Sequence, residues 1–102
     1  MPKTYKKIKP IISYNDFREK AVKVSSFTSS TGKRYKVKSI VDNEMYFLRL
    51  DAKSDQEWSM NLEELYRAYK ELEDFATKNF KPYVPITHSP GRGLLIHLGL
   101  LV

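Results

Sequence analysis

The sequence predicts a single α+β domain: a small antiparallel β-meander of three to four strands packed against one long helix, with short N- and C-terminal helices. Apolar and polar residues alternate through much of residues 27–60, as they do in half-buried strands. The apolar residues of 61–80 follow the 3.6-residue period of an amphipathic helix. A chain of 102 residues fits one domain. We place this domain at residues 13–102, after a basic arm at residues 1–12.

The N-terminal arm is rich in lysine and contains Pro10 near its end. Because proline disfavours helix at the residue before it, the arm is expected to be extended. Lysines interleaved with Tyr5 and Ile8 could follow a phosphate backbone, with the tyrosine ring stacking on a base. The alternative is a frayed terminus, or a short edge strand that the lysines protect from pairing.

A short helix is predicted to begin after Ser13. Ser13 can accept a hydrogen bond as the N-cap, and Asp16 follows near the positive end of the helix dipole. The apolar residues of this segment recur at spacings of three and four and form one face: Tyr14, Phe17, Ala21 and Val24.

The meander begins with a short strand at Phe27 and a turn at Gly32, where glycine can adopt positive φ. In the strand over residues 34–41, alternation places two sets of side chains on opposite faces. One set is Tyr35, Val37 and Val41, and the other is Arg34, Lys36 and Lys38.

The next strand covers residues 45–50 and is expected to point Tyr46, Leu48 and Leu50 inward. Turns are predicted on both sides of it. A short strand at residues 58–60 then completes the meander, and Trp58 is predicted to be a core anchor against the long helix.

The long helix is predicted over residues 61–80. Asn61 is a favourable N-cap, and Glu64 stands at the position that completes a capping box. One face of the helix is apolar and consists of Leu62, Leu65, Tyr66, Tyr69, Leu72 and Ala76. The helix should stop near Phe80, because Pro82 disfavours helix at the residue before it.

The last predicted helix has Ser89 as its N-cap and Pro90 as its first residue, and it stops at Gly99. Seven of the last nine residues are Leu, Ile or Val. A segment of this kind marks an interaction surface when it is exposed, so we predict a homodimer that uses it. Docking of the segment on Tyr14, Phe17 and Val24 of the same chain is the alternative.

The charge is distributed unevenly along the chain. The formal net charge is +6, but residues 1–40 carry eleven basic and two acidic residues (+9), whereas residues 41–80 carry five basic and ten acidic residues (−5). A basic surface concentrates polyanions such as nucleic acid or an acidic protein. The absence of cysteine excludes a disulfide scaffold and a thiolate zinc site, and it fits a cytoplasmic location. No apolar run is long enough to span a membrane.

The basic strand and the arm are the main candidate site. Alternate residues of a strand recur at about 7 Å, close to the spacing of phosphates along a nucleic-acid strand. No array of Asn or Gln is placed to distinguish bases, so little sequence specificity is expected, and DNA is not distinguished from RNA. The predicted nucleic-acid-binding residues are Lys6, Lys7, Lys9, Lys33, Arg34, Lys36 and Lys38.

Arg92 is a weaker candidate for anion binding. It lies between Gly91 and Gly93 at the start of the last helix, where free backbone N–H groups and a guanidinium could hold a phosphate. The alternative is an ordinary glycine-containing turn before the helix.

Enzymatic chemistry is less well supported. His88 and His97 have no recognisable acid and nucleophile in the sequence, so no catalytic residue, metal ligand or cofactor is predicted. Asp42 followed by Asp51-Ala52-Lys53 resembles the metal-binding arrangement of the PD-(D/E)xK nucleases. That resemblance implies two carboxylates holding Mg²⁺ and a lysine that positions water. The same acidic residues are equally typical of turns.

The sequence therefore predicts a non-enzymatic nucleic-acid-binding module. The alternative is a protein–protein interaction or self-assembly module, such as an accessory subunit of a larger complex. The apolar C-terminal segment and the uneven charge favour this alternative. A metal-dependent nuclease is the third hypothesis.

Overall fold

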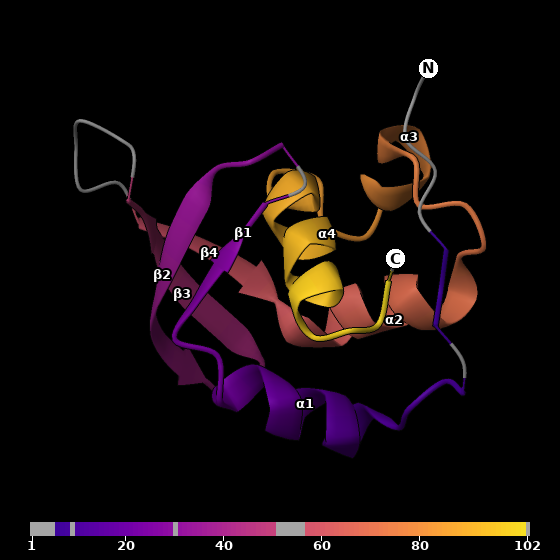
Figure 1. Cartoon of the computed structure of the whole chain (residues 1–102), viewed down its shortest axis with the longest axis horizontal. Coiled ribbons are helices and arrows are strands. Elements are labelled where there is room, and N and C mark those ends of the chain that lie inside the picture. Colours follow the sequence, from indigo (N-terminus) through magenta and orange to yellow (C-terminus); the bar gives the residue numbers. More distant parts are fainter. Residues whose placement is uncertain (1–5, 9, 30, 51–56, 102) are drawn as a thin grey trace.

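The described part of the chain forms an antiparallel sheet and four helices (Figure 1). The computed structural model describes residues 6–8, 10–29, 31–50 and 57–101. The four strands lie in the order β1-β2-β3-β4, so the predicted α+β class and antiparallel meander are confirmed. The strands are β1 (Ser26–Thr28), β2 (Arg34–Val41), β3 (Glu44–Arg49) and β4 (Glu57–Asn61).

The helices are α1 (Tyr14–Val22), α2 (Leu62–Glu71), α3 (Thr77–Phe80) and α4 (His88–His97). Two of the three predicted N-caps, Ser13 and Asn61, are confirmed, whereas the third, Ser89, is wrong because it lies inside α4 and Thr87 is the N-cap residue there. The Ser13 side chain accepts a hydrogen bond from the Asp16 N–H at 3.2 Å, and the Asn61 side chain accepts one from the Glu64 N–H at 3.0 Å. Helix α4 begins at His88, two residues before the predicted first residue Pro90, and Gly99 follows its end with φ at 78°.

The prediction of one long helix over residues 61–80 is wrong. Helix α2 ends at Glu71, and Leu72 has an extended backbone. The Asp74 carboxylate accepts a hydrogen bond from the Ala76 N–H at 3.0 Å, and Asn79 donates to the Asp74 carbonyl at 3.3 Å. Such local side-chain bonds compete with helical ones. The chain therefore bends between α2 and α3, and Phe75 is fully buried at the bend.

The predicted inward set of β3 is also wrong. Met45 and Phe47 are fully buried, whereas Tyr46 and Leu48 are half-buried on the opposite face and Leu50 is 51% exposed. Residues 45–48 are all apolar or aromatic, so alternation alone does not tell which set faces the core. The structure selects the set that can pack against the helices.

A register shift in β2 corrects a second prediction. The pairing of β2 with β3 is irregular between Val37 and Ser39, so one extra residue is inserted in β2. Ile40 consequently lies opposite Met45 and packs against the core. Val41, predicted to share a face with Tyr35 and Val37, is 56% exposed.

Trp58 is not fully buried, as a core anchor would be. It lies opposite Phe47 in the β3–β4 register and packs at the margin of the core while remaining partly exposed. The indole N–H is nevertheless buried and has no hydrogen-bond partner among the described residues. The largest fully buried side chains include Tyr69, Phe17, Phe47, Phe75 and Phe80.

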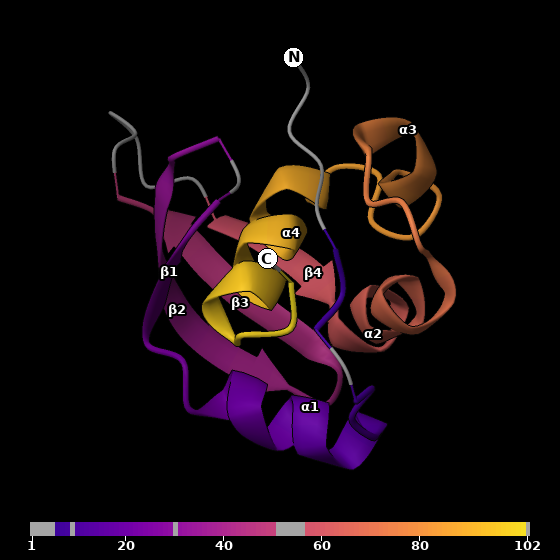
Figure 2. The same ribbon diagram turned by 45° about the vertical axis from the view of Figure 1, so that its right-hand side comes forward.

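The sheet and the helices form two layers. In Figures 1 and 2, α2 and α4 lie on one face of the sheet, with α1 along its lower end. Among the described elements, no helix covers the opposite face. The core lies between the sheet and α2 and α4.

The apolar C-terminal segment packs within the chain. Leu94, Leu95, Leu100 and Leu101 are all buried. The Ile8 N–H donates to the Leu100 carbonyl at 2.9 Å, so part of the N-terminal arm lies alongside the segment. Intrachain docking, the alternative in the sequence analysis, is therefore what the structure shows. The homodimer prediction loses its supporting argument, although the oligomeric state itself remains a prediction.

Glycine allows α4 to lie directly against the end of β1. A Cβ added at Gly93 would come 2.1 Å from the Thr28 carbonyl oxygen and 2.5 Å from the Ser29 Cα. A Cβ at Gly91 would meet only side chains, the nearest being the Leu65 Cδ1 at 3.0 Å. Close packing of α4 on β1 therefore requires glycine at position 93.

Candidate nucleic-acid interface

We use the name outer face for the side of the sheet opposite α2 and α4. Strand alternation and the register of the four strands place these residues on it: Ser26, Thr28, Arg34, Lys36, Ser39, Tyr46, Leu48, Glu57 and Ser59. Arg34 and Lys36 are exposed, as the sequence predicted. Lys36 lies opposite Leu48 on β3 and Ser26 on β1. The two cations therefore border a partly apolar surface.

Lys38 lies at the register shift of β2 and is also exposed. Its Nζ is 2.9 Å from the Glu57 carboxylate on β4. Both side chains remain partly exposed, and an ion pair of this kind contributes at most about 1 kcal/mol. An incoming phosphate can therefore compete for Lys38 at little cost. Lys36 makes no ion pair with the part of the chain that the structure describes.

Tyr46 gives the outer face an aromatic side chain. It lies opposite Ser39 in the register and is half-buried, so part of the side chain is accessible. Sequence reasoning missed this residue because it assigned Tyr46 to the core. An accessible ring next to a row of cations is the combination on which bases of a single strand stack.

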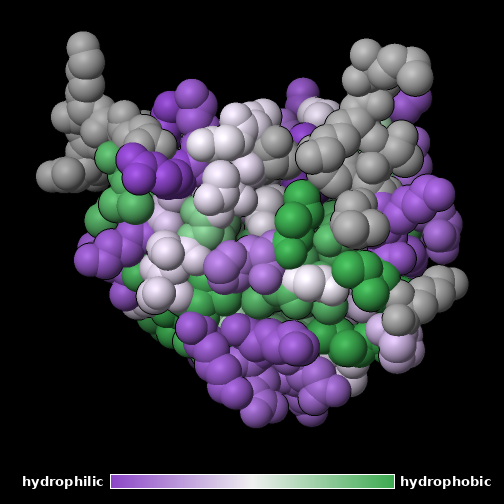
Figure 3. Space-filling view, in the orientation of Figure 1, coloured by the Kyte–Doolittle hydropathy of each residue, from purple (hydrophilic) through white to green (hydrophobic). Residues whose placement is uncertain are grey.

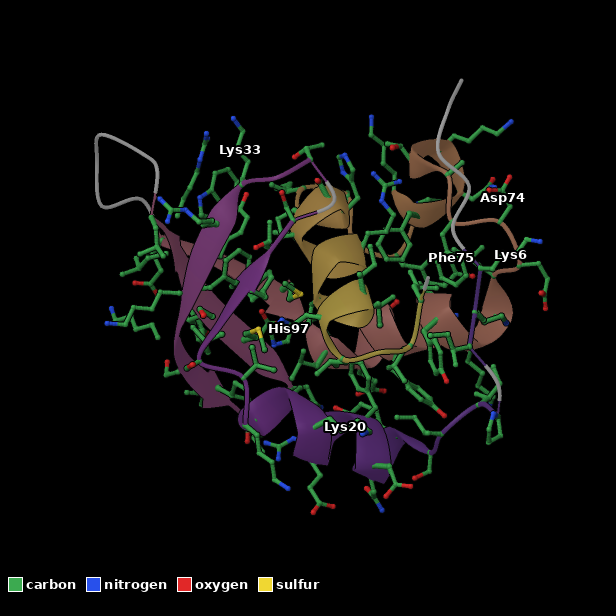
Figure 4. All side chains as sticks on the ribbon, viewed as in Figure 1. Lys6, Lys20, Lys33, Asp74, Phe75 and His97 are labelled. Carbon is green, nitrogen blue, oxygen red and sulfur yellow. The ribbon has the colours of Figure 1, made fainter. Side chains whose placement is uncertain are left out.

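The structure does not place the lysines of the N-terminal arm next to the basic strand β2. The Lys7 side chain is only 5% exposed; its Nζ is 3.4 Å from the Glu73 carboxylate and donates to the Lys70 carbonyl at 3.1 Å. Lys6 is exposed, and Lys9 lies outside the described residues. Figure 4 shows Lys6 and Lys33 on opposite sides of the molecule. Lys33 is exposed in the turn before β2, so it remains next to the basic strand.

Arg92 lies inside the domain. It is 8% exposed, and its guanidinium donates to the Phe75 carbonyl at 2.9 Å and to the Thr77 hydroxyl at 3.2 Å. These bonds connect α4 to the bend between α2 and α3. The placement gives Arg92 a structural role, and the interface proposed below does not use it.

Residues considered for catalysis are dispersed. Asp42 is exposed in the turn between β2 and β3 at φ 55°, whereas Asp51 and Lys53 lie outside the described residues. The two histidines occupy opposite ends of α4, and a ring nitrogen of His88 is 3.2 Å from the Pro85 carbonyl. Within residues 6–8, 10–29, 31–50 and 57–101, no three His, Asp or Glu side chains gather in a way that could hold a metal ion.

A cluster of perturbed titrating groups lies away from the outer face, between α2 and Tyr83. The Tyr83 hydroxyl donates to the Glu71 carboxylate at 2.9 Å. This hydrogen bond is the main cause that lowers the pKa of Glu71 and raises the pKa of Tyr83. Arg67 bonds the same carboxylate at 3.4 Å, which raises the pKa of Arg67. Tyr83 and Arg67 both donate hydrogen bonds to the Glu71 carboxylate, so these contacts hold the segment around Tyr83 against α2.

Comparison with known proteins gives no match: no family model, no curated protein and no solved structure is significantly similar to the chain. Among the described helices, none is both long and apolar enough to cross a membrane.

Proposed function

We propose that the protein is a non-enzymatic module that binds single-stranded nucleic acid on its outer face. The observation that carries the proposal is the position of Arg34 and Lys36 on a sheet face that none of the described helices covers. Lys38 pairs with Glu57 of the same face, and the accessible side chain of Tyr46 lies beside these cations. The cations neutralise phosphates, and the ring stacks on a base. The net charge of +6 draws the polyanion toward the protein.

A single strand suits this surface better than a duplex does. Stacking on Tyr46 requires an unpaired base, and paired bases of a duplex are not available for it. Phosphate contacts and stacking do not distinguish one base from another, so we expect little sequence preference.

The salt dependence of binding tests the proposal. A labelled single-stranded dodecamer is titrated at about 50 to 200 mM salt, a range over which phosphate contacts weaken strongly. We expect the wild-type affinity to fall steeply as the salt concentration rises. For Lys36→Gln/Lys38→Gln, the slope of log affinity against log salt concentration should be shallower by about 1.4, because each phosphate contact with a single strand contributes about 0.7. Fluorescence anisotropy provides the affinities.

The matched control is Lys70→Gln/Lys81→Gln, which removes the same charge from two exposed lysines away from the outer face. Its slope should equal that of the wild type. If the log–log salt slope became shallower by the same amount in both double variants, only the net charge would matter for binding, and the assigned site would be contradicted. No binding at about 50 mM salt would contradict the function.

The second candidate is a protein-docking module. Val41 and Leu50 favour it because each is an apolar side chain that is more than half exposed. They lie at opposite ends of β2, Val41 as its last residue and Leu50 beside Arg34, so each offers a separate apolar contact to a partner. A protein partner would depend on these two residues rather than on Lys36 and Lys38. The double lysine variant therefore discriminates between the two functions.

A further inference from the structure

A hollow of about 460 Å³ lies between the C-terminal ends of α1 and α4, beside the start of β1. We call it the helix-end pocket. Its lining residues are Lys20, Lys23, Val24, Ser25, Ser26, His97 and Leu98. Figure 4 shows His97 at the end of α4 above Lys20 on α1.

The polar side chains of the pocket are available to a ligand. Lys20 and His97 are exposed, and their side chains form no hydrogen bond or ion pair with the described part of the chain. Lys23 is 3.8 Å from Glu19, but both side chains are largely exposed, so solvent weakens this pair. Two ammonium groups, an imidazole and two serine hydroxyls can all donate hydrogen bonds. Donors of this kind suit a phosphate group.

A second hollow, of about 270 Å³, adjoins the helix-end pocket along β1. It shares Ser26 and His97 with that pocket and is also lined by Thr28 and Arg34. Ser26 lies opposite Lys36 in the β1–β2 register, and neighbouring strands are about 5 Å apart. A chain of phosphates on β2 can therefore continue around the edge of β1 toward His97.

The basic surface that the phosphates could follow ends beyond the helix-end pocket. The next hollow, of about 260 Å³, shares Lys20 and Lys23 but is also lined by Asp16 and Glu19. These carboxylates repel a phosphate. In Figure 3, hydrophilic side chains cover α1 along the lower edge of the molecule, and the change of charge sign occurs within this helix. The basic surface therefore has a defined end at Lys20 and Lys23.

We propose that the helix-end pocket binds a phosphate group at the end of the strand that lies on the outer face. This inference rests on the proposed function and extends it by a second contact site built from Lys20, Lys23 and His97. Lysine and histidine in the last turn of a helix also offset its carbonyl end. That role affects helix stability only, so a binding measurement distinguishes the two.

The test compares three double variants with the wild type, using the single-stranded dodecamer. Lys20→Gln/Lys23→Gln removes the pocket cations, Lys36→Gln/Lys38→Gln removes those of the outer face, and Lys70→Gln/Lys81→Gln is the charge-matched control. We expect the first two to flatten the log–log salt slope by about 1.4 each, and the control to leave it unchanged. Thermal melts of all variants are run in parallel.

The NMR signals of the two histidines provide a second test, which uses the wild-type protein. The dodecamer should shift the imidazole NMR signals of His97 more than those of His88, which lies at the other end of α4. Inorganic pyrophosphate at the same ionic strength tests a free phosphate as the ligand. If pyrophosphate shifts His97 and the dodecamer does not, the assignment to the strand is overturned.

The failure of this inference is distinguishable from that of the proposed function. Suppose that the salt slope of Lys20→Gln/Lys23→Gln equals that of the control, whereas the salt slope of Lys36→Gln/Lys38→Gln is shallower. The helix-end pocket is then not part of the interface, but the outer face still is. A lowered melting temperature of the pocket variant with an unchanged slope leads to the same conclusion. If the wild type does not bind at about 50 mM salt, both are overturned.

Discussion

Gly93→Ala is expected to destabilise the protein by about 3 kcal/mol or more, because the new Cβ would lie 2.1 Å from a backbone oxygen of β1. Backbone atoms cannot rotate away as the end of a side chain can, so α4 must separate from the sheet. For a domain of this size, each kcal/mol lowers the melting temperature by roughly 4–8 °C. A melt followed by circular dichroism measures the effect.

Gly91→Ala is the matched control in the same helix. Alanine favours the helix over glycine by about 1 kcal/mol at either position. At position 91 the nearest obstacle is the end of the Leu65 side chain, at 3.0 Å, which can give way. We therefore expect a change within about 1 kcal/mol. Equal effects of the two substitutions would contradict the close packing of α4 on β1.

Phe47→Ala is expected to cost about 3–5 kcal/mol, the usual cost of removing a fully buried phenylalanine. Its neighbour Tyr46 lies on the outer face, so Tyr46→Ala should cost about 1 kcal/mol or less, the range of strand propensities. Urea denaturation of both variants gives the free energies of unfolding.

These two substitutions also separate stability from binding. Tyr46→Ala should weaken binding of the dodecamer, because stacking on an aromatic ring contributes about 1–3 kcal/mol for each base. If Tyr46→Ala proved as destabilising as Phe47→Ala, the two faces of β3 would be wrongly assigned, and the outer face would lose its aromatic contact.

Local signals in the sequence predicted the fold class and several element boundaries. The Ser13 and Asn61 caps, the span of β2 and the turn at Gly32 each depend on a few neighbouring residues, and the structure confirms them. The length of α2 was not predictable in the same way. The apolar periodicity of the sequence continues past Glu71. At the bend, however, the Asp74 side chain accepts a hydrogen bond from the Ala76 N–H, and this bond competes with continuation of the helix.

The errors in the sheet arise from contacts between strands. Residues 45–48 are all apolar or aromatic, so only packing against the helices decides which pair is buried. The extra residue between Val37 and Ser39 coincides with a break in the alternation, polar Ser39 followed by apolar Ile40, but one such break does not identify a register shift; the shift turns Val41 outward. The glycines on both sides of Arg92 suggested a phosphate site at the start of the last helix, whereas Gly93 allows that helix to pack closely on β1.

The candidate site was predictable in part. Alternation along β2 placed Arg34 and Lys36 on the exposed side of the strand, and the structure agrees. Lys7 looked equivalent in sequence, but its contacts with Glu73 and Lys70 are long-range and occupy it within the fold. The helix-end pocket joins side chains of α1 and α4, which are far apart in the sequence. Their proximity depends on the tertiary fold.

Binding of single-stranded nucleic acid by the outer face is the central claim, and amide NMR signals test it most directly. The labelled wild type is titrated with the unlabelled dodecamer, and the shift of each amide is mapped onto the fold. We predict the largest shifts at residues 34–38 of β2 and 46–48 of β3, with α3 unaffected. The absence of shifts, or shifts concentrated in residues 6–8 and α3, would contradict the claim.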